Sequence, residues 1–391
     1  MNYILSDGSL WDSFLPFTFT RPVAEIRMGI LTIKEKWEKW LMTSVSTQTK
    51  THLSQKFPLK TASQNIIISA NYLPDDKLVQ KIKALKEGEA LFDGDVLVAF
   101  FTETPVEKHD LSKCKRIVLE HVPSKIENVW DIFSKNAEAL QSDFNMLTQG
   151  RQSQPLSTTN QVLDSENIFL EEGAQVEFSI LNASTGPIYI GKGAQIMEGC
   201  TIRGGLALCD NAVIKMGAKL YGPSTFGPYC KVGGEVSNSV LFAHSNKGHE
   251  GFLGNSVLGE WCNLGADTNT SNLKNNYAPV RLWDYKTEGF AQTGLQFCGL
   301  IMGDHSKCGI NTMFNTGTVV GVSANIFGSG FPRNFIPSFS WGGASGFSTY
   351  RTKKAYETAA AMMKRRDMEF DKIEEAVLDH VFELTKKWRK E

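Results

Sequence analysis

The sequence predicts an α/β domain, then a parallel β-helix, then a C-terminal helix. The main observation is an aliphatic or aromatic residue at every sixth position from Ile190 to Val232, in a chain that is 41% hydrophobic. The series is Ile190, Ile196, Ile202, Leu208, Ile214, Leu220, Phe226 and Val232. A period of six fits neither an α-helix nor a plain strand. It is typical of a parallel β-helix, in which each six-residue unit turns its aliphatic residue inward.

The first part of the chain, residues 1–155, has the pattern of an α/β domain. Short apolar runs at 3–5 and 65–69 predict buried strands, and residues 90–99 predict a hairpin around an Asp-Gly turn. Amphipathic patterns predict helices over 30–41, 75–85 and 131–147. Residues 148–165, rich in Gln, Ser and Thr, are typical of a linker.

The β-helix is expected over residues 166–335, with two interruptions. The six-residue pattern is lost between Val232 and Phe252 and again over 275–287. We expect both segments to be loops that leave the coil, where functional residues tend to collect. The final unit, 350–391, has apolar residues at helical spacing and predicts one long helix over 353–390 that caps the β-helix or contacts another subunit.

Composition excludes several classes of function. A net charge of −1 gives no electrostatic reason to bind nucleic acid or an anionic membrane. The seven cysteines form no CxxC pair, so we expect free buried thiols and a reducing compartment. No secretory leader and no apolar run of membrane-spanning length is evident. We therefore expect a cytoplasmic protein without nucleic-acid or membrane partners.

The first candidate site lies at the start of the chain. Asp7-Gly8 follows the first predicted strand, and Arg21-Pro22 comes shortly after. A glycine-bearing turn after a strand can present backbone N–H groups to a phosphate, and an arginine can bind a phosphate through two hydrogen bonds. The alternative is an ordinary strand-to-loop turn that binds no ligand.

The second candidate site is centred on His249, where the coil resumes. A histidine beside an open cleft is a natural general base, although a histidine that bonds within its loop is the alternative. His244 and His249 also resemble two of the three zinc ligands of gamma-class carbonic anhydrases. The third histidine is missing, and a catalytic zinc needs three protein ligands, so we expect no zinc. Asp304 lies between coil positions and is expected at a corner that faces solvent or a neighbouring subunit.

Three stretches resemble a known family of enzymes. Residues 15–22 (LPFTFTRP) are similar to the P-L-T-x-T-R-P stretch of sugar-1-phosphate nucleotidyltransferases. Residues 248–259 (GHEGFLGNSVLG) and 263–268 (NLGADT) are similar to the acetyltransferase half of GlmU. The layout of nearly the whole chain resembles the GlmU-like sugar nucleotidyltransferases of Bacteroidetes. This resemblance implies a nucleotidyltransferase-like first domain and a left-handed β-helix with acyltransferase activity.

The resemblance also implies roles for individual residues. His249 matches the base that accepts a proton from the sugar amine. The implied contacts are Lys247, Phe252, Asn272 and Tyr277 for the acceptor sugar phosphate, Ala266 and Asp304 for acetyl-CoA, and Asp7, Gly8, Arg21 and Pro22 for the nucleotide. The implied substrates are a sugar phosphate, a nucleoside triphosphate and acetyl-CoA, with Mg²⁺ assisting nucleotidyl transfer through ligands that the motifs do not identify. Members of this family act as homotrimers with the site between neighbouring β-helices.

The chain departs from the family at several positions. Residues 7–11 (DGSLW) replace the usual G-x-G-T-R loop, Val23 replaces a lysine, and Phe252 replaces a tyrosine. The expected function is therefore a transferase of nucleotide-sugar synthesis, resembling UDP-N-acetylglucosamine diphosphorylase and glucosamine-1-phosphate N-acetyltransferase. Two alternatives remain: a non-catalytic scaffold that binds sugar nucleotides, and a single-activity nucleotidyltransferase or an acyltransferase that acts on another amino sugar.

Overall fold

The computed structural model describes residues 1–103 and 114–389. The chain divides into two compact units. The N-terminal unit contains Met1–Phe14, Thr20–Ile26 and Leu31–Asn128, and the β-helix unit contains Leu15–Phe19, Arg27–Ile30 and Val129–Glu391. Residues 129–155, which the sequence pattern assigned to the first domain, thus group with the β-helix.

The N-terminal unit is built on one six-stranded sheet in the order β2-β1-β3-β5-β4-β6. Its strands are β1 (Asn2–Ser6), β2 (Ser46–Gln48), β3 (Asn65–Ser69), β4 (Glu89–Asp93), β5 (Val96–Thr102) and β6 (Lys115–Val118), and its α-helices are α1 (Ile33–Leu41) and α2 (Asp76–Lys83). Strand β1 pairs in parallel with both β2 and β3. Helix α1 begins with a capping box between Thr32 and Glu35, which satisfies two of its first N–H groups. The predicted α/β class and the hairpin at residues 90–99 are confirmed.

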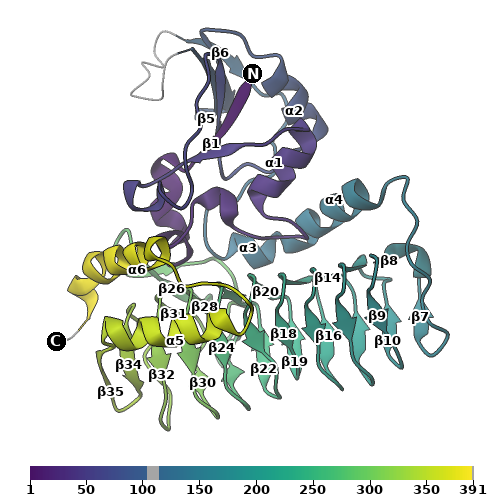
Figure 1. Cartoon of the computed structure of the whole chain (residues 1–391), viewed down its shortest axis with the longest axis vertical. Helices are drawn as coiled ribbons and strands as arrows, with labels where there is room; N and C mark the ends of the chain where they lie inside the picture. The colour runs from purple at the N-terminus through teal and green to yellow at the C-terminus, as the bar shows by residue number, and fades with distance from the viewer. Residues whose placement is uncertain (104–113, 390–391) are drawn as a thin grey trace. The chain divides into compact units, whose positions relative to one another are not determined.

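The β-helix unit has three faces of stacked parallel strands, which Figure 1 shows as a regular row of coils. Face 1 contains β7 (Gln161–Leu163), β10 (Ile180–Asn182), β13 (Thr201–Arg203), β16 (Lys219–Tyr221), β19 (Glu235–Ser237) and β22 (Phe252–Gly254). Face 2 contains β8 (Ile168–Leu170), β11 (Ile188–Ile190), β14 (Leu206–Leu208), β17 (Ser224–Phe226), β20 (Val240–Leu241), β23 (Val257–Leu258), β28 (Leu300–Met302), β31 (Thr318–Val320) and β33 (Phe335–Ile336). Face 3 contains β9 (Gln175–Val176), β12 (Gln195–Ile196), β15 (Val213–Ile214), β18 (Lys231–Val232), β21 (Asn246–Lys247), β24 (Asn263–Leu264), β29 (Lys307–Cys308), β32 (Asn325–Ile326) and β34 (Ser340–Gly343). Strand β35 (Gly346–Thr349) ends this face and pairs with β34 in the antiparallel direction. A separate pair, β25 (Asn269–Thr270) with β30 (Met313–Phe314), follows β22 in the stack.

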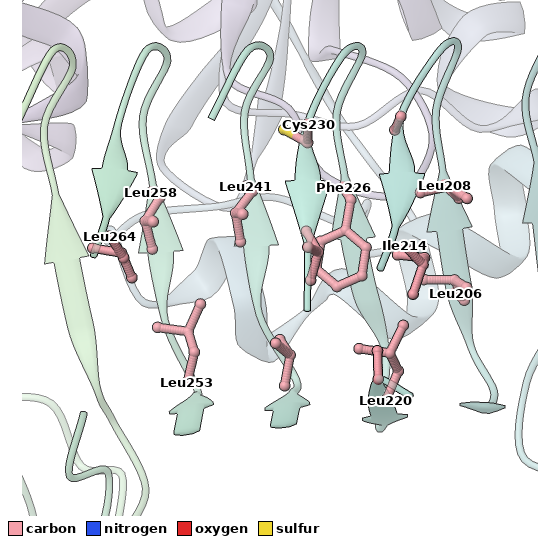
Figure 2. Close-up of a cluster of buried hydrophobic side chains, with 14 of the residues drawn as sticks. Leu206, Leu208, Ile214, Leu220, Phe226, Cys230, Leu241, Leu253, Leu258 and Leu264 are labelled. Carbon is pink, nitrogen blue, oxygen red and sulfur yellow. The ribbon is translucent and has the colours of Figure 1, made fainter. Parts of the chain in front are cut away.

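The predicted six-residue series forms the core of this unit. Its members point inward and are at most 3% exposed, as Figure 2 shows for the central coils. Ile190 pairs with Leu208, and Leu208 pairs with Phe226, so equivalent residues stack on successive coils. Full burial of each such side chain contributes on the order of 1.5–3 kcal/mol, and the regular ladder therefore stabilises the coil along its length. The predicted fold class is confirmed.

The first predicted interruption is wrong. Between Val232 and Phe252 the chain stays in the coil and forms β19, β20 and β21. The inward residues there are Val236, Leu241 and Lys247, at steps of four, five and six, so shortened corners and a lysine hide the pattern.

The second predicted interruption is confirmed. Residues 271–299 leave the coil and carry the antiparallel hairpin of β26 (Arg281–Asp284) and β27 (Gly289–Gln292). Phe290 lies in β27 of this hairpin and is 44% exposed.

The helices of this unit flank the coil. They are α3 (Asp131–Ser134) and α4 (Asn136–Thr148) before the β-helix and α5 (Thr352–Lys364) and α6 (Lys372–Leu384) after it. The single long C-terminal helix that the sequence predicts is thus two helices, separated at Asp367, whose φ of 56° is left-handed. Its last residue, 390, lies outside the described residues. No α-helix in the described ranges has the length and apolar character needed to cross a membrane.

Candidate active site

A cleft of about 580 Å³ lies on face 3 of the β-helix. Its floor includes Lys231, Asn246 and Asn263, which occupy the outward positions of three successive strands. Arg365 and Arg366, at the end of α5, line it from the other side. The volume is within the range of pockets that hold small organic ligands.

The cleft is strongly cationic. Lys215, Lys231, Arg365 and Arg366 line it, and no aspartate or glutamate does. None of these four cations forms an ion pair with a carboxylate of the described residues. Burial lowers the pKa of Lys231, and the nearby charges of Arg366, Lys215 and Arg365 lower it further. An anionic ligand would relieve this repulsion, so the cleft is suited to phosphate groups.

One edge of the cleft is a column of stacked rings at the corner between faces 2 and 3. The His244 ring lies 4.1 Å from the Trp261 ring at an angle of 3°, and 5.2 Å from the Tyr229 ring. His305 continues the column beyond Trp261 at 6.3 Å. Arg366 donates to the Tyr229 carbonyl oxygen at 3.4 Å, which connects α5 to this corner. Burial lowers the pKa of His244, and this favours a neutral ring in the stack.

The opposite edge of the cleft is the corner between faces 3 and 1. His249 follows β21 at this corner, is exposed, and lines the cleft. Ala266 lines the cleft at the same corner of the next coil. The two corners are joined by a hydrogen bond from the Asp267 amide to the Glu250 carbonyl oxygen at 3.1 Å. The Ala266 amide donates to no acceptor within the described part of the chain. An imidazole and an open backbone donor thus lie one coil apart.

Gly251 is needed to close the corner that carries His249. Its φ is +110°, and an added Cβ would lie 2.1 Å from the Thr268 carbonyl oxygen. A residue with a side chain would be strained there and would collide with the backbone of the next coil.

The predicted contact between Lys247 and the acceptor sugar phosphate is wrong, because the Lys247 side chain points into the coil. It is 2% exposed and donates to the carbonyl oxygens of Gly233, at 3.0 Å, and His249. An inward lysine cannot reach a sugar phosphate bound outside the coil.

The other predicted acceptor contacts are Phe252, on face 1, and Asn272 and Tyr277, in the excursion that leaves the coil. Phe252 is outward on β22, since its neighbour Leu253 is fully buried. Asn272 donates to the Asn255 side-chain oxygen at 2.8 Å, and Tyr277 is 67% exposed at the start of the excursion. Neither Phe252, Asn272 nor Tyr277 lines the cleft on face 3. His249 therefore lies at the corner between the cationic cleft on face 3 and the face that carries Phe252.

Asp304 is part of the corner structure. It is 4% exposed, and its Oδ1 accepts the Glu260 amide of the preceding coil at 2.8 Å. An added Cβ at Gly259 would lie 2.1 Å from that same oxygen, so the two corners pack directly together. The structure thus gives Asp304 a bracing role and places it outside the lining of the cleft.

The predicted nucleotide residues come together in the N-terminal unit. The turn at Asp7-Gly8 follows β1, and the Asp7 side chain accepts the Val23 amide at 2.8 Å and the Thr49 hydroxyl at 2.5 Å. This contact brings the segment Arg21-Pro22 beside the turn. Asp7 and Arg21 are 2% and 5% exposed, whereas Gly8 is exposed with a φ of +51°. Burial raises the pKa of Asp7 to about 6, although the bonds from Thr49 and Val23 oppose that rise.

The position of this turn in the sheet is typical of a ligand site. Strand β1 lies between β2 and β3, and all three strands run in parallel. The turn therefore lies at the carboxyl edge of the sheet, between strands that lie on opposite sides of β1, and ligands of open α/β sheets bind at such a point. Lys50 follows β2 at the same edge and lies 5.0 Å from the centre of the Trp11 ring. Lys50 supplies a positive charge that the sequence motif did not identify.

Three carboxylates of this unit, those of Asp7, Asp93 and Asp95, already have partners within the described chain. Both oxygens of Asp7 accept hydrogen bonds from the chain. Asp93 accepts from Lys125 at 3.0 Å, and Asp95 pairs with Arg116 at 2.7 Å. No group of three or more potential metal ligands occurs in the described residues.

Sequence reasoning missed much of the cleft. Lys231 occupies the outward position beside the core residue Val232, and this alternation is visible once the coil register is known. Arg365-Arg366 is a basic pair at the end of an amphipathic helix. His244 and Trp261 stack because both occupy the same corner of successive coils, which no local motif reveals.

Comparisons with known proteins found a family match and several relatives. Residues 3–152 match the sugar nucleotidyl transferase family. The bifunctional protein GlmU of Methanocaldococcus jannaschii is 33% identical over 87 residues, which are 22% of this chain and 21% of that protein. GlmU of Synechococcus elongatus is 26% identical over 151 residues, or 37% of this chain and 29% of that protein. This chain therefore spans less than a third of the length of these relatives.

A comparison with solved structures matches the UDP-N-acetylglucosamine acyltransferase from Campylobacter jejuni. It is 16% identical, covers 60% of this chain and 83% of its own, and has a TM-score of 0.28. The polysialic-acid-specific acetyltransferase NeuO covers 54% of this chain and 94% of its own, at 14% identity and a TM-score of 0.27. Residues 3–152 thus resemble sugar nucleotidyl transferases, and part of the chain resembles the bifunctional GlmU proteins.

Proposed function

We propose that the β-helix transfers an acetyl group from acetyl-CoA to the amino group of an amino-sugar phosphate. The observation that carries this proposal is the meeting of His249, the open Ala266 amide and four unpaired cations in one cleft. Coenzyme A carries several phosphate charges, which match a cleft lined by Lys215, Lys231, Arg365 and Arg366. The motif similarity to GlmU and the relatives named above support the same reaction.

The proposed chemistry uses His249 as a general base. The sugar amine attacks the thioester carbonyl carbon, a C–N bond forms, and the C–S bond breaks. His249 accepts the proton that the amine loses and passes it to the departing thiolate, so the reaction is balanced. The Ala266 amide would donate to the acyl oxygen as negative charge develops on it. The acceptor would approach from face 1, where Phe252 and Asn272 lie and where Lys219 and Glu250 form an ion pair at 3.6 Å.

The decisive test is release of free CoA from acetyl-CoA in the presence of glucosamine 1-phosphate. We expect turnover by the native chain and a loss of about 10²-fold or more in His249→Ala, the scale of losing a general base. His380→Ala, on the exposed surface of α6, is the matched control. A panel of other amino-sugar phosphates would identify a different acceptor. Full activity of His249→Ala would refute the assignment.

For the N-terminal unit we propose binding of a nucleotide or nucleotide sugar at the Asp7-Gly8 turn, with nucleotidyl transfer to a sugar 1-phosphate as the activity. The family match over residues 3–152 and the position of the turn at the edge of the sheet support this proposal. Pyrophosphate release from a nucleoside triphosphate and a sugar 1-phosphate tests it.

A second function, binding without turnover, is favoured by one observation. Asp7 is buried and fully hydrogen-bonded, so the turn presents no carboxylate for a metal. Tight binding of a UDP-sugar with no pyrophosphate release at any Mg²⁺ concentration would establish the scaffold function for this unit.

We also propose that the chain functions as a homotrimer. Large apolar side chains are exposed on the corner column that carries His249: Met216 is 67% exposed, Ile310 70% and Phe327 42%. These residues belong to different coils of one corner, and a neighbouring copy would cover them and enclose the cleft.

A further inference from the structure

Lys247 occupies a position that the coil otherwise gives to apolar residues. In the register of face 3 it pairs with Val232, which pairs with Ile214. Its side chain is 2% exposed, so a long cationic side chain replaces an aliphatic one inside the core. Burial of an ammonium group is costly unless hydrogen bonds compensate, and such a residue therefore calls for an explanation beyond packing.

The amino group of Lys247 binds the backbone of two successive corners from inside. It donates to the Gly233 carbonyl oxygen at 3.0 Å and to the carbonyl oxygen of His249 itself. These corners are already packed closely, since an added Cβ at Gly234 would lie 2.7 Å from the His249 carbonyl oxygen. The lysine thus anchors the main chain of His249 to the coil below.

The charged groups around Lys247 define its electrostatic setting. Glu250 and Asp267, on the two adjacent corners, favour its charged form, and Cys308 does so from the core. Lys219 on face 1 opposes that form. Burial is the largest influence and lowers the pKa of Lys247 to about 8. The amine donates hydrogen bonds in either form, so its contact with the corner persists through neutral pH.

We propose that Lys247 is a positioning residue for the reaction at His249. It fixes the peptide of His249 from inside the β-helix, so that the imidazole is held at the edge of the cleft and facing the bound acyl group. This inference rests on the proposed acetyl transfer. A displacement of about 1 Å in a catalytic group can cost about 10²-fold in rate, so a single internal anchor can control activity.

Lys247→Met tests the proposal, since methionine fills the same channel without a donor. We expect kcat for CoA release to fall at least tenfold while KM for acetyl-CoA changes less than threefold. The midpoint of urea unfolding should change little, because loss of the hydrogen bonds and removal of a buried charge oppose each other. Ile214→Met, in the same column two coils away, is the control for altered core packing and should keep native kcat.

A second measurement does not depend on activity. Amide hydrogen exchange at Glu235 and Asp267, whose N–H groups donate to the Gly251 and Glu250 carbonyl oxygens of this corner, should accelerate about tenfold or more in Lys247→Met, with exchange in the rest of the coil unchanged. Native kcat or native exchange in Lys247→Met, with an active native chain, overturns the positioning role alone. A native chain without acetyltransferase activity would instead refute the proposed acetyl transfer, and the positioning role of Lys247 with it.

Discussion

Individual residues show which part of the site a motif can predict. His249 and Ala266 were identified by similarity, and both line the same cleft. The direction of Lys247 could not be predicted, because it depends on a coil register that shortened corners conceal. A motif fixes the order of residues, whereas the inward or outward direction of each one depends on the alternation of the folded strand.

Asp7 provides a pH-dependent prediction at this scale. Its pKa is about 6 in the folded chain and 3.8 without burial, so folding favours the protonated form. Its contribution to stability is therefore fully present below pH 3.8 and is lost as the pH rises through about 6. Asp7→Asn keeps an acceptor for Val23 and removes the charge. We expect it to raise the unfolding free energy at pH 7 by up to about 3 kcal/mol, with no gain near pH 3.5, measured by urea titration. An equal effect at both pH values would contradict the assignment.

The two arginines of the cleft give a second prediction. Replacing Arg365 and Arg366 together by alanine removes half of the unpaired positive charge that lines it. We expect KM for acetyl-CoA to rise about tenfold or more, with a weaker dependence on salt than the native chain shows. Replacing Lys353 and Lys364 together by alanine, two exposed lysines of α5 outside the lining, is the charge-matched control. Equal salt dependence in the double variant and the native chain would place the anion elsewhere.

Strands and corners were predictable to different degrees. The inward ladder follows from its period of six, because burial imposes the same requirement on every coil. Corners vary in length without disturbing the core, so the segment from Val232 to Phe252 was misinterpreted as a loop. The two C-terminal helices were read as one because the break at Asp367 contains neither glycine nor proline.

A pair of glycines tests the corner that carries His249. An alanine at Gly251 would have a φ of +110° and a Cβ only 2.1 Å from the Thr268 carbonyl oxygen. At Gly248 the nearest atom to an added Cβ is 3.9 Å away, and the backbone is not left-handed. We therefore expect Gly251→Ala to lower the unfolding free energy by about 2 kcal/mol or more, and Gly248→Ala to change it by less than about 1 kcal/mol. Similar unfolding midpoints for the two variants would show that the corner tolerates a side chain at both positions.

For the whole molecule, the testable property is its assembly. A chain of 43.4 kDa that forms the proposed trimer should sediment with three times that mass. Ile310→Arg places a charge on the exposed apolar corner and should yield the single-chain mass, with loss of acetyl transfer. Arg substitution at Met42, which is even more exposed and lies in the N-terminal unit, should leave the mass unchanged. A native chain that sediments at 43.4 kDa would refute the trimer.

The β-helix also fixes the distances between side chains on successive coils. Neighbouring strands in a sheet are about 4.8 Å apart, so every corner is one such step from the next. Ala266 is one step from His249 along the axis, and Lys231 and Lys215 lie one and two steps in the other direction. In the proposed reaction, the distance between the thioester carbonyl at His249 and the lysines that would bind the CoA phosphates is thus a whole number of coil spacings. Deletion of the coil that carries Lys231 would bring Lys215 about 5 Å closer to His249. The β-helix would then select an acyl donor that is shorter by this distance, while the residues at the His249 corner stay the same.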